Sequence, residues 1–349
     1  MSGTLNLNSI TISIDAMGGD FGPESAIPGL AIVHKDHPEL RFLIYGDENR
    51  IYPLLNKYKS LSAVSQVHHT ATVIKSDEKP SSALRSSKGT SMRLAVEAVQ
   101  SGQADAIVSS GNTGALMALA KVVLRPLSGI HRPAIASVFP TISGTTVMLD
   151  LGANVLVDAE NLVQFAVLGA VFAKVNTGKD KPSVGLLNVG SEDMKGPDHV
   201  RGAAEILSKI EFNGHYYGFV EGNDITKGTV DVVVTDGYAG NIALKTAEGV
   251  SKLSSYYFKK SIKSSPLAML GGLFAYGALK RFKTSLDPRL QNGGVFMGLN
   301  GLCVKSHGGS DDVGFASAVR LSVQLAQHGY IKRVADEINH LLTQESFLA

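Results

Sequence analysis

The chain has 349 residues, of which 44% are hydrophobic and 18% charged, with 37 glycines, no tryptophan and one cysteine. A net charge of +2 gives no overall field of the kind that marks nucleic-acid-binding proteins, and one cysteine excludes an intramolecular disulfide and any multi-cysteine metal site. These values favour a globular protein of a reducing compartment. Residues 1–9 are polar and lack the pattern of a signal peptide, so we expect a cytoplasmic protein.

Short apolar runs alternate with helical patterns along the chain. The runs predict strands at 10–14, 41–45, 106–109, 134–138, 147–151, 183–189 and 231–235. The helical patterns lie at 24–33, 91–99, 115–124, 159–173, 199–210, 242–258 and 314–327. This alternation predicts one large α/β domain, a three-layer α/β/α structure with a mostly parallel sheet. Right-handed crossovers then place the turns after the strands along one sheet edge.

The turn after the third of these strands is rich in small and polar residues: Ser110, Gly111, Asn112, Thr113 and Gly114. Glycines allow a close approach of the backbone, and the helix that follows directs N–H groups at whatever lies beyond its first turn. We interpret this turn as a phosphate or carboxylate site, with Asn112 and Thr113 as further donors. An ordinary tight turn is the structural alternative.

A second polar turn follows the predicted strand 231–235. It contains Asp236 and Asn241, and Lys245 lies one helical turn beyond Asn241 on the same face. Asn241 can donate from its amide beside the charge of Lys245, and Asp236 can orient Lys245 or a neighbouring N–H group. The alternative is that Asn241 only caps a helix and Lys245 is solvated.

Two further loops carry candidate residues. Lys195, in the loop after the strand 183–189, has the length to reach a phosphate or a developing oxyanion, although most loop lysines are solvated. Lys305 and His307 belong to a late turn rich in glycine and hydroxyl residues, where a histidine with its ordinary pKa can handle protons near neutral pH. Asp15 and Asp20 end another strand, and we assign them to holding loops or orienting cations because carboxylates repel phosphate.

The segment 256–283 breaks the alternating pattern. A 13-residue apolar stretch, 267–279, is too short to span a bilayer, and its flanks are basic: Lys259, Lys260, Lys263, Lys280, Arg281 and Lys283. We expect a helical projection near 255–285. Its basic and apolar pattern suits either an anionic membrane surface or the acidic surface of a partner, and a buried hairpin or a dimer contact is the alternative.

Several common catalytic motifs are absent from the sequence. It has no Gly-x-Gly-x-x-Gly fingerprint, no Walker pattern, no Gly-x-Ser-x-Gly elbow and no His-Glu-x-x-His. Nothing in it requires a metal ion or a cofactor. A dehydrogenase using NAD and a covalent acyl-enzyme mechanism are therefore disfavoured.

The ordered set of motifs resembles one family, the bacterial phosphate acyltransferases, which convert acyl-acyl carrier protein and inorganic phosphate to acyl phosphate. The matching stretches cover nearly the whole chain: 15–20, 110–117, 149–154, 186–190, 220–225, 236–245, 298–301 and 305–308. The stretch 293–298 and Gly309 depart from the family's usual residues.

The resemblance implies a fold similar to that of phosphate acetyltransferases, a homodimer, and a role at the start of phospholipid synthesis. The product would pass to a membrane glycerol-3-phosphate acyltransferase. It also implies that Lys195 and Asn241 are active-site groups. We expect the turn 110–114 and Lys245 to hold phosphate, Lys195 and Asn241 to face the thioester oxygen, and His307 to tune the protonation of phosphate. A phosphate acetyltransferase and a noncatalytic membrane scaffold are the remaining alternatives.

Overall fold

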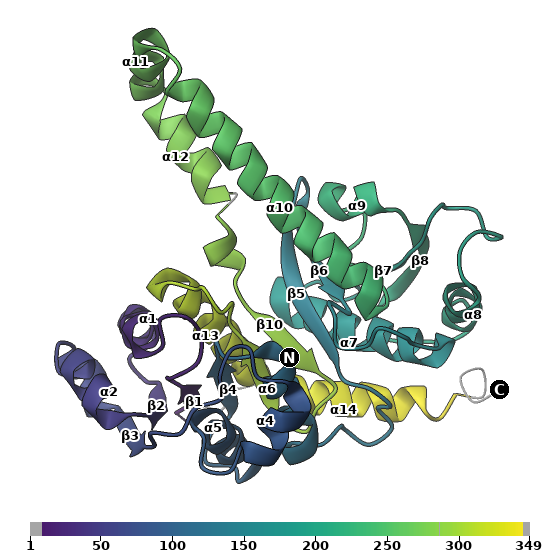
Figure 1. Ribbon diagram of the computed structural model, residues 1–349. Helices are drawn as coiled ribbons and strands as arrows, with labels where there is room; N and C mark the ends of the chain where they lie inside the picture. The colour runs from purple at the N-terminus through teal and green to yellow at the C-terminus, as the bar shows by residue number, and fades with distance from the viewer. Residues whose placement is uncertain (1–8, 286, 345–349) are drawn as a thin grey trace.

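The computed structural model describes residues 9–285 and 287–344, without the side chains of residues 272, 282, 283, 285 and 288. Its centre is an 11-stranded sheet with the order β3-β2-β1-β4-β11-β10-β5-β6-β9-β7-β8 (Figure 1). The strands are β1 Thr11–Asp15, β2 Arg41–Gly46, β3 Ser65–His69, β4 Ala106–Ser109, β5 Ala134–Thr141, β6 Gly144–Leu149, β7 Ser183–Leu187, β8 His215–Val220, β9 Val232–Val234, β10 Gly294–Met297 and β11 Leu302–Lys305.

Helices cover both faces of the sheet. They are α1 Pro23–Asp36, α2 Glu48–Leu55, α3 Lys59–Ala63, α4 Pro80–Ser86, α5 Ser91–Gln100, α6 Thr113–Val123, α7 Ala159–Thr177, α8 Asp198–Leu207, α9 Gly222–Lys227, α10 Gly237–Ile262, α11 Pro266–Phe274, α12 Tyr276–Ser285, α13 Asp312–Gln327 and α14 Tyr330–Leu341. Side chains of β4 alternate between two cores: Ala106 and Val108 pack with α1, α7 and α13, and Ile107 packs with α5 and α6. The predicted three-layer α/β/α architecture is therefore confirmed.

The direction of the strands divides the sheet into two parts. Strands β3, β2, β1, β4 and β11 are parallel to one another, and the short β10 is antiparallel to both of its neighbours, β11 and β5. Strand β6 is antiparallel to β5, and β9, β7 and β8 follow β6 in parallel. The carboxyl ends of β1, β4 and β11 thus lie at one edge and those of β6, β7 and β9 at the opposite edge. The prediction of one common edge was wrong.

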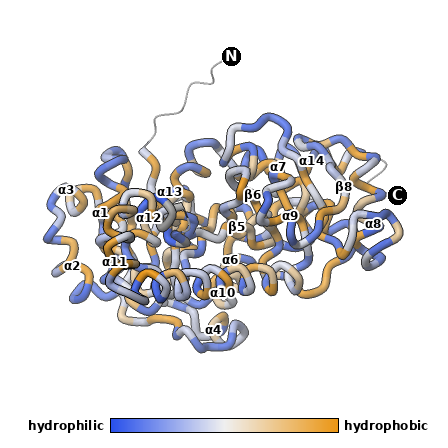
Figure 2. The backbone as a smooth tube through the Cα atoms, turned by 90° about the horizontal axis from the view of Figure 1, so that it is seen from above, coloured by the Kyte–Doolittle hydropathy of each residue, from blue (hydrophilic) through white to orange (hydrophobic). Residues whose placement is uncertain are grey.

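Helices α10, α11 and α12 form a projection that extends away from the sheet (Figure 1). Of the 26 residues of α10, only Gly237 and Gly240 are buried. The expected helical projection near 255–285 is present, and it is longer than predicted because α10 begins at Gly237. At its tip, α11 exposes Leu267, Leu273 and Phe274, and this apolar segment is visible in Figure 2. Within one chain the projection is therefore not a buried hairpin.

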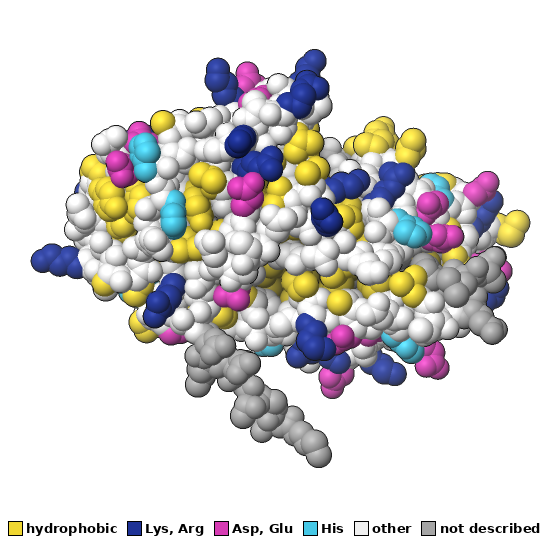
Figure 3. Space-filling view, turned by 90° about the horizontal axis from the view of Figure 1, so that it is seen from below, with side chains coloured by type: hydrophobic (Ala, Val, Ile, Leu, Met, Phe, Trp, Pro, Cys, Tyr) yellow, Lys and Arg dark blue, Asp and Glu magenta, His cyan; other side chains and the backbone are white. Residues whose placement is uncertain are grey.

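No helix in residues 9–285 and 287–344 has the length and apolar character needed to cross a membrane. Seen from below, basic and acidic side chains are interspersed over the surface (Figure 3), as the small net charge suggests. The predicted basic residue Lys283 lies outside the described side chains, and residues 1–8 of the polar start of the chain lie outside the described residues.

Candidate active site

Three loops at the carboxyl edge of β1, β4 and β11 pack together, and we call them the first cluster: residues 15–22, 109–114 and 305–311. The Asp20 amide donates a hydrogen bond to the Gly308 carbonyl at 2.9 Å, and the Ser306 amide donates to the Ser109 carbonyl at 2.9 Å. A Cβ atom on Gly18 would lie 2.5 Å from the backbone nitrogen of Gly111, so only glycine fits there. Backbone contact alone thus brings the three loops to one place.

The buried carboxylate of Asp15 supports the first cluster through hydrogen bonds. It accepts hydrogen bonds from the Ser91 and Ser109 hydroxyls, both at 2.7 Å, and from the Met17 amide at 3.3 Å. Burial raises the pKa of Asp15, although the hydroxyls of Ser109 and Ser91 act in the opposite direction. Asp15 is 2% exposed and orders the loops, which is one of the two roles expected of it.

Donor groups of the first cluster are available to an anion. The Ser110 side chain is 3% exposed, and its hydroxyl has no hydrogen-bond partner among the described residues. A buried polar group without a partner costs free energy, which a ligand can recover. At the start of α6, no contact in the described structure pairs the N–H groups of Thr113 and Gly114. These groups give the cluster the character of an anion site.

Lys305 brings a positive charge to the same cluster. Its ammonium donates hydrogen bonds to the carbonyls of Ser110, at 3.2 Å, and of Ser306, and the residue is 8% exposed. Burial lowers the pKa of Lys305 to about 8, while the charges of Asp15 and Asp20 act to raise it. The charge is therefore present near neutral pH and costly to keep buried, so an anion placed beside it would be stabilised.

His307 and Asn112 are both engaged by the protein itself. The Gly309 amide donates to Nδ1 of His307 at 3.2 Å. Asn112 caps α6 by accepting from the Ala115 amide at 3.0 Å, and its Nδ2 donates to the carbonyls of Ser76 and Glu78. The Asn112 amide, which we predicted to donate to an anion, is thus used to order the loop, and the backbone of the turn remains for the ligand.

The other predicted residues lie in a second cluster, formed by residues 150–154, 188–196 and 236–245 at the opposite sheet edge. Asp150 organises it: the buried carboxylate accepts from the amides of Ile135, Gly152, Ala153 and Asn154 and from the side chain of Asn154. Burial raises the pKa of Asp150, against these hydrogen bonds. Its role is to fold the loop after β6, onto which the start of α10 packs through the Gly237 amide and the Asn154 carbonyl.

The start of α10 has a simple structural explanation. Asp236 is its N-cap and accepts a hydrogen bond from the Ala239 amide at 2.7 Å, which is one of the two roles expected of it. Asn241 therefore lies inside the helix, with its side chain exposed beside Gly152. Lys245 forms an ion pair with Glu248 at 3.5 Å.

Lys195 lies in the loop between β7 and α8. Its carbonyl accepts from the Asn188 side chain at 3.0 Å, and its ammonium pairs with Glu192 at 2.6 Å while remaining half exposed. Within residues 9–285 and 287–344, no hydrogen bond or ion pair joins the second cluster to the first. The structure thus brings Ser110–Gly114, Lys305 and His307 together. Asp236, Asn241 and Lys245 lie at the start of α10, and Lys195 lies in another loop of the same, opposite edge without a hydrogen bond or ion pair to them in the described structure.

Comparison with known proteins places this geometry in a family. A family model described as fatty acid synthesis protein matches residues 10–333. Phosphate acyltransferase from Paramagnetospirillum magneticum is 54% identical over 97% of this chain and 96% of its own length. The phosphate acyltransferase from Rhodospirillum centenum is 54% identical over 95% of this chain and 93% of its own. The chain belongs to the phosphate acyltransferase family. The protein is thus an acyltransferase, as the motifs predicted.

Solved structures agree with the fold. EutD phosphotransacetylase from Staphylococcus aureus has a TM-score of 0.57 at 15% identity and covers 92% of this chain and 96% of its own. A phosphotransacetylase from Streptococcus pyogenes has a TM-score of 0.58 at 18% identity and covers 91% of this chain and 94% of its own. At these identities the likeness concerns the fold alone, and it confirms the expected similarity to phosphate acetyltransferases.

The sequence did not predict two residues that support the first cluster. Ser91 donates a hydrogen bond to Asp15, and Asn292 contacts the loop that carries His307. Ser91 begins an ordinary helix and Asn292 precedes a short strand, so no motif marked either residue. The pair Asn292-Gly293 gives only the signal of a turn. No group of three or more His, Cys, Asp or Glu side chains suitable for a metal ion occurs among the residues that the structure describes.

Proposed function

We propose that the whole chain acts as a single domain that transfers a fatty acyl group from acyl-acyl carrier protein to inorganic phosphate, with phosphate bound at the first cluster. The proposal rests on one observation: the buried Lys305, the unpaired Ser110 hydroxyl and the unpaired N–H groups at the start of α6 lie in one place. Each of these groups favours an anion. The relatives are named phosphate acyltransferases, so we take phosphate as the anion.

The reaction needs positioning more than acid-base chemistry. A phosphate oxygen attacks the thioester carbonyl carbon, the C–O bond forms, the C–S bond breaks, and the proton of monohydrogen phosphate passes to the leaving thiolate. Holding both reactants in place is worth about 7 kcal/mol or more, and one aimed donor adds about 3 kcal/mol. Lys305 and the N–H groups of the turn 110–114 hold phosphate in this scheme, and His307 exchanges protons at its rim.

The test is the phosphate-dependent release of carrier thiol. We expect Lys305→Met to lower turnover about a hundredfold and Ser110→Ala about tenfold, because each removes a donor to the anion. Lys121→Met, at an exposed position late in α6, is the matched control and should keep wild-type turnover. Thiol release that does not need phosphate, or full activity of Lys305→Met, would refute the proposal. Palmitoyl-carrier protein and acetyl-CoA, compared as donors, test the acyl source.

The roles of Lys195, Asp236, Asn241 and Lys245 remain predictions. We infer that Lys195 and Asn241 face the thioester oxygen in a homodimer, where the second cluster of one chain meets the first cluster of its partner. The long helix α10 supports a dimer because most of its residues are exposed and several of the exposed ones are apolar: Tyr238, Ile242, Val250 and Leu253. A dimer of this kind would let two clusters at opposite edges share one reaction.

The projection is proposed as the contact with the membrane surface, where a glycerol-3-phosphate acyltransferase takes the product. Its support is the exposed apolar side chains of α11 between Lys259, Lys260 and Lys263 on one side and Lys280 and Arg281 on the other. Phe274→Asp should abolish flotation with anionic vesicles and leave the KM for acyl-carrier protein unchanged. A raised KM with unchanged flotation would instead assign the projection to the carrier protein.

A further inference from the structure

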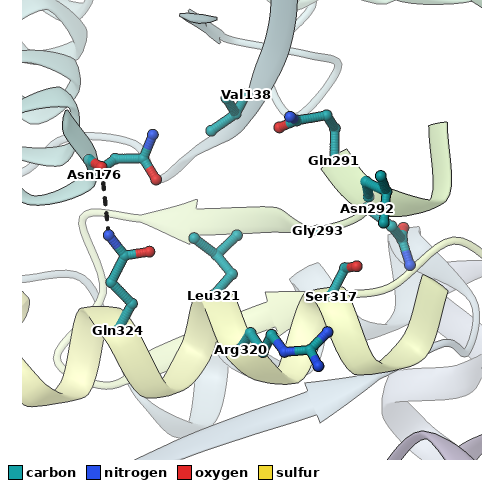
Figure 4. A pocket seen from close by; sticks show the side chains of 10 residues that line it. Val138, Asn176, Gln291, Asn292, Gly293, Ser317, Arg320, Leu321 and Gln324 are labelled. Carbon is teal, nitrogen blue, oxygen red and sulfur yellow. Dashed lines mark hydrogen bonds between the residues drawn. The ribbon is translucent and has the colours of Figure 1, made fainter. Parts of the chain in front are cut away.

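Asn292 joins the end of the projection to the first cluster. The chain returns from α12 through a short 3-10 helix, η1 Pro288–Gln291, and Asn292 follows it directly before β10. The side chain of Asn292 is partly buried and spans the gap to the loop after β11. A hollow of about 230 Å³ lies beside it, lined by η1, β5 and α13 (Figure 4).

The contacts of Asn292 fix both ends of its amide. Oδ1 accepts a hydrogen bond from the His307 amide at 3.0 Å. Nδ2 lies 2.7 Å from the Gly314 carbonyl, 2.8 Å from the Ser306 hydroxyl and 2.9 Å from the Ser310 hydroxyl. The reversed amide would set an oxygen against the Gly314 carbonyl and an NH₂ against the His307 N–H, so the orientation is determined.

These contacts concern the part of the loop that faces the anion site. Ser306, His307 and Ser310 lie between Lys305 and the start of α13, and the Gly308 carbonyl among them accepts a hydrogen bond from the Asp20 amide. Arg289, in η1, pairs with Asp311 at 2.8 Å, and Asp311 caps α13 by accepting from the Gly314 amide. The segment 289–292 thus holds the loop at two points.

We propose that Asn292 is a positioning residue for the loop 305–311, which places Lys305 and His307 toward phosphate. The proposal rests on the proposed function, because it takes the first cluster as the phosphate site. Without Asn292, the His307 N–H loses its acceptor and the loop can leave the geometry in which Lys305 and the turn 110–114 converge. Neither the motifs of the chain nor its likeness to the relatives assigns this role to Asn292.

The test is a comparison of Michaelis constants in Asn292→Ala, Asn292→Asp and a matched control. We expect either variant to raise the KM for phosphate about tenfold, which corresponds to the loss of about one hydrogen bond with a partner left unpaired. The KM for the acyl donor should change less than about twofold. Gln291→Ala is the control, because Gln291 lines the same hollow but makes no hydrogen bond to the loop in the described structure (Figure 4).

Three outcomes separate the possibilities. A merely structural role would lower the melting temperature and kcat and leave the ratio of the two KM values at its wild-type level, which would overturn the proposal. A wild-type KM for phosphate in folded Asn292→Ala or Asn292→Asp would also overturn it. Wild-type enzyme that releases thiol without phosphate would instead refute the proposed function. Asn292→Asp keeps the acceptor for the His307 N–H but loses the NH₂ donor and sets an oxygen against the Gly314 carbonyl, so it should also displace the loop, and it serves if Asn292→Ala does not fold.

Discussion

Lys305 makes the stability of the protein depend on pH at the scale of a single residue. Burial lowers its pKa from the ordinary 10.5 to about 8, so between these values the unfolded chain holds a proton that the folded chain has released. Stability therefore rises with pH across this window, by about 3 kcal/mol at most. Below about pH 8 the lysine is charged in both states, and the full cost of burying the charge is present.

The measurement is denaturant unfolding of the wild type and of Lys305→Met at about pH 8 and about pH 10. Other groups titrate in this range too, so the quantity of interest is the difference between the two proteins. We expect the wild type to gain stability relative to the variant as the pH rises. Parallel pH profiles would show that Lys305 is not buried as a charge.

Asp150 offers a second prediction at this scale. Asp150→Asn keeps the size of the side chain but turns one acceptor oxygen into an NH₂ group among N–H donors, which leaves several of them unpaired. We expect a loss of about 3 kcal/mol in the free energy of unfolding. Urea titration checks it, with Asp180→Asn, which is exposed, as the control. Equal losses in the two variants would contradict the role given to Asp150.

The residue types along the chain predicted which loops form the first cluster better than they predicted the role of each side chain in it. The turn 110–114, Lys305 and His307 were all candidates for the phosphate site, and they lie in adjoining loops. Lys245, which was expected to hold phosphate together with that turn, lies in the second cluster instead. Asn112 was expected to donate to a ligand, but its amide instead holds the chain at Ser76 and Glu78, a contact between segments that no local pattern reveals. Asn292 was missed for the same reason.

At the scale of elements, the packing of loops predicts a large effect of one methyl group. Gly18→Ala would place a carbon 2.5 Å from the Gly111 nitrogen and 2.8 Å from Oδ2 of Asp15. Both neighbours are held by their own hydrogen bonds, so the loop after β1 must move away from the turn 110–114. We expect activity to fall more than about tenfold, with a loss of about 2 kcal/mol in stability.

The control for this change is Gly222→Ala. Gly222 begins α9 and has no atom within 4 Å of an added Cβ, so alanine fits there without displacing a neighbour. Thiol release and thermal unfolding compare the two variants. If Gly18→Ala keeps wild-type turnover, the three loops of the first cluster do not need the contact that this structure shows.

The predictable elements are the buried ones. Strand β4 and helix α7 are apolar runs with buried side chains, and both were expected within a few residues of their positions. Strands β3 and β8 were missed because they lie at the two ends of the sheet, where half-exposed residues such as those of 215–220 lose the apolar pattern. The short β10 carries only four residues and runs antiparallel to both of its neighbours.

For the whole molecule, the direction of strands matters more than their number. The residue pattern of a strand does not show whether the neighbouring strand runs parallel or antiparallel to it. The alternation of strands and helices therefore predicted a mostly parallel sheet with all the candidate turns at one edge. Strand β6, which is antiparallel to β5 and followed in parallel by β9, β7 and β8, turns the second part of the sheet around and sends the loops of Lys195 and Asn241 to the far edge. If both clusters serve one reaction, the homodimer proposed above would let two chains supply them.

Mixed dimers test this arrangement. Neither Lys305→Met, which damages the first cluster, nor Lys195→Ala, which damages the second, should be active alone. In a dimer of the two variants, one of the two shared sites combines an intact first cluster with the partner's Lys195. Random pairing of equal amounts then restores about a quarter of the wild-type activity. If each site is built within one chain, the mixture regains no activity, because each chain carries a defect in one of its two clusters. A mixture of the two variants without activity would therefore place the reaction within a single subunit.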